Sequence, residues 1–454
     1  MSRRRRRDAR RRATCSGVSG VSGASGVSAA SGAGAGSKRS ATGGSSNAGS
    51  GSGGGDAGGA RDAGDAGAGG PPAGIPPAAP AHLARRRMRI GFDGTPLLGA
   101  KTGVGWYTHE LIDAAAKLSP QDELVVFPIS WRTARYLKLD PPHRPNVAVE
   151  RKLAPARPLW AMWDRVQFPP VEWLVDCDVF HATNFIAPPS RRVPVVVTVH
   201  DIGFVHHPEA VNPGVRRMAR LLPDILRRAA AIITVSSFTR QELVSWLPEV
   251  GGKVTVIHNG SHGRTRIASG ADDGTTPPYA LMLGTLEPRK NLPLALDALR
   301  ILRRRGVDLR LVLAGGKSPL LDVPALLRKR GLGEPEVTRT GYIDDARVSA
   351  LLAGARVLVF PSLYEGFGMP LLEGMEAGVP VVGVRAGATP ETVGDAGLLV
   401  EPGDAEAFAD AMEAAAFDEE LRARLVPAGH AQAARFTWEQ AAGETLALYR
   451  KVRP

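Results

Sequence analysis

Short apolar runs rich in valine and isoleucine alternate with amphipathic stretches along the chain from residue 88 onward. The amphipathic stretches, such as "GWYTHELIDAAAKL" and "SSFTRQELVSWL", have the apolar period of helices. Near-continuous apolar strands between helices predict parallel sheets that are covered on both faces. The expected strands are 88–93, 123–128, 178–182, 193–200, 230–236, 253–260, 279–285, 309–316, 337–343, 356–362, 379–384 and 397–403.

A polar stretch rich in glycine, threonine and proline, "SHGRTRIASGADDGTTPP", interrupts this pattern. Its composition is typical of an interdomain linker. We therefore expect an α/β protein with two doubly wound Rossmann-like domains that face each other across a cleft. In such sheets ligands bind at the carboxyl ends of the strands, so the cleft is the expected active site. The expected parts are a tail at 1–87, a first domain at 88–262, a linker at 263–277, a second domain at 278–430 and a C-terminal segment at 431–454.

Composition changes this picture for the tail. The formal net charge is +12, but residues 1–87 hold 14 basic and 4 acidic residues and therefore carry +10 of it. The remainder is nearly neutral, and the tail has few large apolar residues to bury, so we expect the tail to be disordered. One interpretation is that translation begins at Met88. The other is that the arginine blocks attract RNA or a membrane surface.

Three observations bear on location. The basic start is followed by no apolar segment of the secretory type. No run approaches the ~20 apolar residues of a membrane span. The two cysteines, Cys15 and Cys177, cannot build a disulfide framework and fit a reducing compartment. We expect a cytoplasmic protein.

The stretch "PSLYEGFGMPLLEGMEAGVPVV" (361–382) joins a predicted strand to a helix through a glycine-rich turn. Glu365 lies in the turn, and Glu373 lies in the helix that Pro370 is suited to begin. Free backbone N–H groups at a helix start attract anions. Carboxylates beside an anion make sense if they accept hydrogen bonds from neutral hydroxyls, as on a sugar. The stretch therefore predicts a site for a polyol together with its phosphates.

Other residues that suggest chemistry also follow predicted strands. Lys290 and Arg289, in "GTLEPRKN", are placed to clamp a phosphate at a helix start, although solvated surface cations are common. Gly103 and Gly105, in "GAKTGVGWYTHEL", open a helix but lack the third glycine of a dinucleotide fingerprint. His200 ends the strand in "VTVHD", where both a structural and a catalytic role are open.

Together these segments resemble the retaining glycosyltransferases of family 4, which have the two-domain GT-B fold. The likeness covers nearly all of 88–454, and the spacing of Glu365 and Glu373 is its most specific part. It implies transfer of a hexose from a nucleotide diphosphate sugar to a hydroxyl, and a C-terminal helix that crosses back to the first domain. The segments that carry it are "GVGWYTHEL", "DVFHATNF", "TVHD", "TVSSFTRQEL", "GTLEPRKN", "LVLAGG", "GYIDD" and "FPSLYEGFGMPLLEGMEAGVPVV".

The resemblance also implies roles for the matching residues. Glu365 is expected on the donor sugar hydroxyls and Glu373 on the nucleotide ribose. Lys290 is expected on the diphosphate and His200 beside the anomeric carbon, so the catalytic candidates are His200, Glu365 and Lys290. Further donor-binding positions are expected at Gly103, Gly105, Gly366, Phe367, Gly368 and Met369.

One position departs from many family members, which have an arginine where this chain has Thr285. Lipopolysaccharide mannosyltransferase-like members share the threonine, and phosphate neutralisation then depends on Lys290 with help from Arg289. The first guess for the donor is therefore GDP-mannose. The expected acceptor is a polysaccharide or a lipid-linked glycan, with peripheral contact to the inner membrane surface and no specific nucleic acid.

No metal or other cofactor is expected, since Lys290 and a helix dipole could stabilise a leaving diphosphate. "DCD" (176–178) matches the D-x-D metal motif of the other large glycosyltransferase fold, but it precedes a strand instead of following one. His206 and His207 lack the spacing of a zinc site.

Two alternatives remain open. A sugar-nucleotide epimerase or a phosphorylase could use the same fold, but an epimerase needs no acceptor site and a phosphorylase ordinarily has a pyridoxal lysine and a longer chain. A protein that binds RNA through its arginine-rich tail belongs to another class. Deletion of residues 1–87 separates these classes, because a transferase keeps its activity without the tail.

Overall fold

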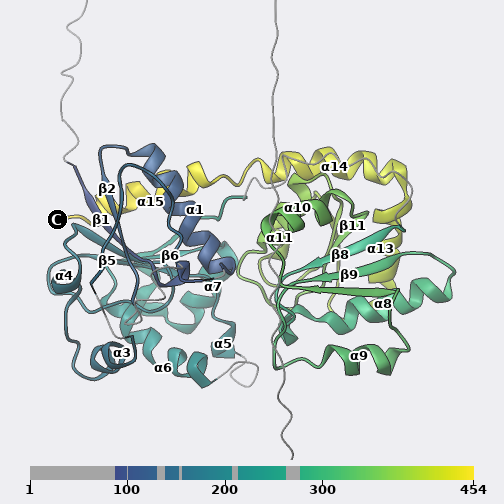
Figure 1. Cartoon of the computed structure of the whole chain (residues 1–454), viewed down its shortest axis with the longest axis horizontal. Helices are drawn as coiled ribbons and strands as arrows, with labels where there is room; N and C mark the ends of the chain where they lie inside the picture. Colours follow the sequence, from purple (N-terminus) through teal and green to yellow (C-terminus); the bar gives the residue numbers. More distant parts are fainter. Residues whose placement is uncertain (1–86, 100, 130–138, 153–155, 207–212, 262–276) are drawn as a thin grey trace, which may run out of the picture. The chain divides into compact units, whose positions relative to one another are not determined.

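The computed structural model describes residues 87–99, 101–129, 139–152, 156–206, 213–261 and 277–454 (Figure 1). Apart from Arg87, the predicted tail lies outside these ranges. The predicted linker lies outside them apart from Pro277. Disorder of the tail and the role of the linker therefore stay predictions.

The first domain is built on seven parallel strands in the order β3-β2-β1-β4-β5-β6-β7. The strand order reverses between β1 and β4, which pair with each other. Doubly wound sheets bind ligands at this topological switch point. The strands are β1 (Arg89–Asp93), β2 (Glu123–Phe127), β3 (Val147–Val149), β4 (Val179–Ala182), β5 (Val195–Val199), β6 (Ala231–Thr234) and β7 (Val254–Val256).

The second domain repeats this plan with six parallel strands in the order β10-β9-β8-β11-β12-β13. Here β8 and β11 are the central pair, so the loops after them define the corresponding binding position. The strands are β8 (Tyr279–Leu283), β9 (Arg310–Ala314), β10 (Val337–Gly341), β11 (Val357–Phe360), β12 (Val381–Val384) and β13 (Leu398–Val400).

Helices connect the strands, and several begin where the sequence supplies a capping side chain. Ser236, Asp404 and Thr437 each accept a hydrogen bond from the backbone N–H three residues further on. The helices are α1 (Gly103–Leu118), α3 (Ala156–Arg165), α4 (Val171–Leu174), α5 (Gly203–His206), α6 (Pro213–Arg228), α7 (Ser237–Trp246), α8 (Leu292–Arg304), α9 (Val323–Arg330), α10 (Asp345–Ala353), α11 (Met369–Glu376), α12 (Thr389–Val393), α13 (Ala405–Phe417), α14 (Glu419–Ala433) and α15 (Trp438–Val452).

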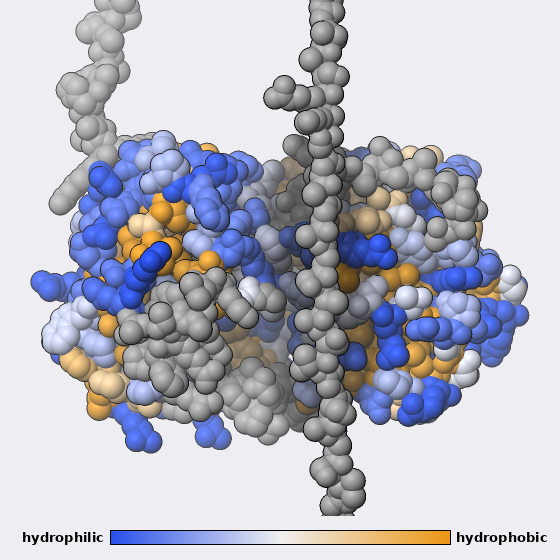
Figure 2. All heavy atoms as spheres, viewed as in Figure 1, coloured by the Kyte–Doolittle hydropathy of each residue, from blue (hydrophilic) through white to orange (hydrophobic). Residues whose placement is uncertain are grey.

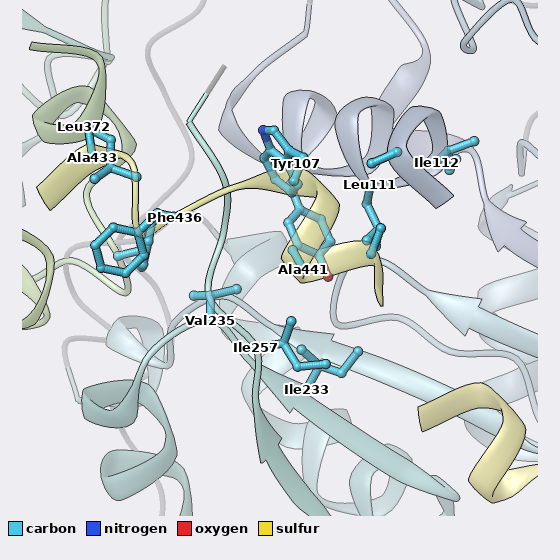
Figure 3. Packing of buried hydrophobic residues seen from close by; sticks show 14 of the residues in the cluster. Tyr107, Leu111, Ile112, Ile233, Val235, Ile257, Leu372, Ala433, Phe436 and Ala441 are labelled. Atoms are coloured by element: carbon cyan, nitrogen blue, oxygen red, sulfur yellow. The ribbon is translucent and has the colours of Figure 1, made fainter. Parts of the chain in front are cut away.

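The last helix, α15, follows α14 of the second domain but packs against α1 of the first. Tyr107 and Leu111 of α1 share a buried apolar cluster with Ala441, Leu446 and Tyr449 of α15. Figure 3 shows Tyr107 and Leu111 next to Ala441. The predicted return of the C-terminal helix to the first domain is confirmed.

The fold class and all the predicted strands are confirmed. The structure adds β3, a three-residue edge strand that the sequence pattern did not predict. The boundary predicted between residues 430 and 431 falls inside α14, because the alanine-rich helix continues to Ala433.

The described surface is mixed in character. Figure 2 shows polar residues over most of the described part of this face, with apolar residues gathered in smaller areas between them. Among the described residues, no helix combines the length and the apolar character that a membrane crossing requires.

Candidate functional site

A buried carboxylate lies between two cations in the loops that follow β8 and β11. Glu365 comes after β11, and Arg289 and Lys290 belong to a single helical turn after β8. Glu365 Oε1 lies 2.5 Å from Lys290 Nζ and 2.7 Å from Nη1 of Arg289. Lys290 and Glu365 are each only 8% exposed. The structure therefore brings these three predicted residues together in one cluster.

Gly284 and Phe360 are neighbours of the Lys290 ammonium. Gly284, directly after β8, has a φ of +122°, a conformation that glycine adopts far more easily than other residues. A Cβ on Gly284 would lie 3.7 Å from Lys290 Nζ. The ammonium also lies 4.9 Å from the centre of the Phe360 ring. The Lys290 ammonium therefore lies close to the Gly284 backbone and to an aromatic face.

The charges of this cluster reinforce one another. Burial raises the pKa of Glu365, but the nearby charges of Lys290 and Arg289 together lower it by more, so the net shift is downward. Burial lowers the pKa of Arg289, but the charges of Glu365, Asp201 and Glu287 outweigh this effect and raise it. At neutral pH the Glu365 carboxylate and the Arg289 guanidinium are therefore both charged. Loss of one partner would leave an uncompensated buried charge.

The glycine turn after Glu365 leads into the start of α11. Gly368 caps α11 in the left-handed conformation with a φ of +96°, and Pro370 stands in the first turn, as predicted. The first backbone N–H groups of a helix have no partner within the helix. Glu373 lies one turn further along α11 and is 8% exposed. A helix start that can attract an anion and a second buried carboxylate therefore follow Glu365 closely in the sequence.

His200 follows β5 in the first domain and is held as a neutral ring. Its Nε2 lies 2.9 Å from the carbonyl oxygen of Thr183, which can only accept, so Nε2 carries the proton. Burial lowers the pKa of His200 to about 4. Nδ1 is then the nitrogen that can accept a hydrogen bond.

The two domains meet where His200 reaches the glycine turn. A Cβ on Gly366 would lie 1.7 Å from the carbonyl oxygen of His200, so only glycine fits there. Thr239 Oγ1 lies 3.3 Å from the carbonyl oxygens of both His200 and Gly366. A Cβ on Gly103 would lie 3.2 Å from the end of the Met369 side chain. Four predicted site residues from two domains are therefore neighbours.

Three predicted donor-binding residues have other surroundings. A Cβ on Gly105 would lie 2.8 Å from the carbonyl oxygen of Pro96, so this glycine is required for packing. The side chain of Phe367 is buried against Phe436, with ring centroids 5.5 Å apart, which leaves its backbone N–H as the group for a ligand. Thr285 is exposed just after β8.

The side chains of the two motifs that were not expected to bind metal pair with other protein groups. Asp178 accepts a hydrogen bond from the backbone of Arg89, whose guanidinium pairs with Asp176 at 2.6 Å. His206 pairs with Glu242 at 2.8 Å, and His207 lies outside the described residues. In the described part of the chain, no three or more His, Cys, Asp or Glu side chains are grouped to hold a metal ion.

Sequence reasoning missed two carboxylates beside the site. Burial raises the pKa of Asp201, which follows His200 and lies within the electrostatic influence of Arg289. Burial also raises the pKa of Asp93, at the end of β1, to about 6, and Asp93 accepts two hydrogen bonds from Thr95. An acidic residue at the end of a predicted strand was the available signal.

Comparison with known proteins identifies the family. The model described as "Glycosyltransferase Family 4" matches residues 101–262, and the model described as "Glycosyl transferases group 1" matches residues 265–432. The chain belongs to glycosyltransferase family 4. It is 30% identical over 401 residues to the O-antigen chain mannosyltransferase B of Escherichia coli, an alignment that covers 80% of this chain and 100% of that protein.

Solved structures agree with this assignment at the level of the fold. Sucrose-phosphate synthase from Thermosynechococcus elongatus matches this glycosyltransferase with a TM-score of 0.64 at 21% identity, covering 81% of this chain and 99% of the other. The structure of Anabaena HepE in complex with UDP-glucose matches with a TM-score of 0.57 at 21% identity, covering 80% and 100%. Both resemblances concern the GT-B fold.

Proposed function

We propose that this glycosyltransferase moves a hexose, with retained anomeric configuration, from a nucleotide diphosphate sugar to a hydroxyl of a glycan. The observation that carries the proposal is the buried cluster of Lys290, Arg289 and Glu365 beside the start of α11 and next to His200. When the glycosidic bond to the diphosphate breaks, negative charge develops on the leaving group. Preorganised cations and helix N–H groups stabilise that charge without reorganisation.

Glu365 has two successive roles in this proposal. Without a diphosphate, it neutralises the two cations and holds them in place. A bound diphosphate offers Lys290 and Arg289 stronger acceptors, and the freed carboxylate oxygens then accept hydrogen bonds from the donor sugar hydroxyls. Glu373, inside α11, is proposed to hold the nucleotide ribose. The carboxylate thus helps to assemble the site around the donor.

His200 supplies a neutral acceptor from the other domain. Because its Nε2–H is donated to Thr183, its Nδ1 faces away from that carbonyl and can accept a hydrogen bond from the sugar. An uncharged ring adds no repulsion to the positive charge that develops at the anomeric carbon. For retention, the acceptor hydroxyl must approach from the face that the diphosphate leaves.

Relatives support the substrates that we propose. The Escherichia coli relative is a mannosyltransferase of O-antigen chains, which supports mannose as the hexose and a polysaccharide or lipid-linked glycan as the acceptor. We propose GDP-mannose as the donor. The complex of HepE with UDP-glucose supports a nucleotide sugar as the donor class. A lipid-linked acceptor would place the enzyme on the cytoplasmic side, in peripheral contact with the inner membrane surface.

Thermal stabilisation by a panel of nucleotide sugars tests the donor. We expect GDP-mannose to raise the melting temperature more than UDP-glucose, and GDP more than UDP. NMR of the glycan formed from the preferred donor should then show the donor's own anomeric configuration. An inverted product would contradict retention, and stabilisation by none of the nucleotide sugars would contradict the donor class.

A further inference from the structure

Buried polar side chains connect the C-terminal helix to the neighbour of His200. Tyr449 of α15 is 2.5 Å from Nδ1 of His181 on β4. His181 Nε2 is 2.7 Å from Thr198 Oγ1 on β5, which in turn is 2.9 Å from the hydroxyl of Tyr107 on α1. Tyr449, His181 and Thr198 are 0% exposed and Tyr107 is 3% exposed. These contacts form a continuous chain of hydrogen bonds from α15 to α1.

The chemistry of this chain fixes each member. Burial lowers the pKa of His181 to about 3, so the ring is neutral and has one donor and one acceptor nitrogen. In one tautomer Tyr449 donates to Nδ1 and Nε2–H donates to Thr198; in the other, Nδ1–H donates to Tyr449, and Thr198, which accepts from Tyr107, donates to Nε2. A buried polar group without its partner is costly, so displacement of one member disturbs the next.

At the α1 end of this hydrogen-bond chain, the ring of Tyr107 packs against the ring of His200. The rings of Tyr107 and His200 meet edge to face, with centroids 4.7 Å apart at 86°. Trp438, the first residue of α15, contacts the same tyrosine ring at 5.8 Å. The imidazole is thus fixed by the Thr183 carbonyl at Nε2 and by the Tyr107 ring.

We propose that Tyr107 is a positioning residue that holds His200 in its productive orientation. We further propose that α15 holds Tyr107 through Trp438 and through the chain from Tyr449. A helix that follows the second domain thereby acts on a side chain of the reaction centre in the first. This proposal rests on the proposed function, because the role of His200 at the reaction centre is part of that function.

Three variants test this positioning in steady-state assays with GDP-mannose. Tyr107→Leu removes the ring, and we expect kcat to fall about tenfold with the donor KM within about twofold, because a misoriented group costs rate more than binding. Tyr107→Phe keeps the ring but loses the hydroxyl that meets Thr198, so kcat should fall by clearly less than in Tyr107→Leu. Tyr279→Leu is the matched control: Tyr279 is also buried and donates to the Leu351 carbonyl at 2.7 Å, far along the chain from His200. It should lower the melting temperature without changing kcat.

The proposal is overturned if Tyr107→Leu keeps the wild-type kcat, if its donor KM rises in parallel, or if Tyr107→Phe is as impaired as Tyr107→Leu. Nitrogen-15 NMR of His200 supplies a readout that needs no activity. The wild type should show the Nε2–H tautomer alone, and Tyr107→Leu should show averaged tautomers. An unchanged tautomer would also overturn the proposal. Full turnover of His200→Ala would instead refute the role proposed for His200, while the NMR comparison still decides whether Tyr107 holds the ring.

The far end of the chain is tested by Tyr449→Phe, which removes the hydroxyl that meets His181. We expect the same pattern as for Tyr107→Leu, with a smaller fall in kcat and partial tautomer averaging at His200. A lower melting temperature with unchanged kcat and tautomer would confine α15 to a structural role.

Discussion

At the scale of residues, the candidate site depends on the buried ion pairs that Glu365 forms with Lys290 and Arg289. Sequence reasoning predicted Glu365, Lys290 and Arg289 because each follows a strand, but it assigned the carboxylate to sugar hydroxyls and the cations to phosphates. The structure pairs them with one another. Such pairing depends on how the loops after β8 and β11 meet, which no local pattern encodes.

Lys290→Ala should weaken the binding of GDP about 10- to 100-fold, because a charge-assisted hydrogen bond contributes roughly 1.5–3 kcal/mol. The matched control is Lys329→Ala, an exposed lysine on α9 of the same domain. Titration calorimetry should show wild-type affinity for the control. Equal affinity in the Lys290 variant would remove this lysine from the diphosphate site.

The pH dependence of transfer should report a neutral His200. Since burial lowers its pKa to about 4, the ring is uncharged above that pH in the folded enzyme. We expect kcat/KM for the donor at pH 5.5 to stay within about twofold of its value at pH 7.5, whereas a histidine with the ordinary pKa of about 6.5 would lose about tenfold. A fall of that size, abolished in His200→Ala, would show that the histidine is solvated.

At the scale of elements, the glycine turn before α11 is the tightest constraint. Gly366→Ala would place a methyl group 1.7 Å from the carbonyl oxygen of His200, so the turn and the end of β5 must separate. We expect a lower melting temperature and loss of transfer. Gly443→Ala is the matched control, because a Cβ there meets nothing within 4 Å in the interior of α15. It should stabilise the fold by about 0.5–1 kcal/mol. Wild-type transfer by Gly366→Ala would contradict the close contact.

The elements themselves were largely predictable. Strands with continuous valine and isoleucine runs, such as β5 and β11, bury both faces and so carry a strong sequence signal. The edge strand β3 was missed because it has three residues, none of them buried. The start of α11 was predictable from Gly368 and Pro370, since both residues have specific backbone preferences.

At the scale of the whole molecule, both domains and the C-terminal helix contribute residues to the candidate site. The sequence predicted the return of α15 through the family resemblance. The chain from Tyr449 to Tyr107 was not predictable, because it joins residues 268 and 91 positions apart in the sequence. Its members have ordinary sequence surroundings, and only the packing of α15 against α1 brings them together.

Transfer should persist in excess EDTA. The proposed charge stabilisation uses Lys290, Arg289 and the start of α11, none of which needs a metal ion. The assay compares turnover before and after chelation, with added manganese or magnesium as the second condition. Loss of transfer on chelation and its recovery with either ion would contradict a cationic site made by the protein alone.

The most direct test of the account is transfer by Glu365→Gln with the preferred nucleotide sugar. The amide keeps the shape of the side chain, but it is uncharged and cannot neutralise Lys290 and Arg289. It also has one acceptor oxygen where the carboxylate has two, so it cannot accept hydrogen bonds from two sugar hydroxyls in the same way. Glu401→Gln is the control, since the Glu401 side chain is 72% exposed in the same domain. We predict that the control transfers like the wild type, whereas Glu365→Gln loses at least about 100-fold in kcat with its domains still folded. Near-wild-type turnover by Glu365→Gln would contradict the account.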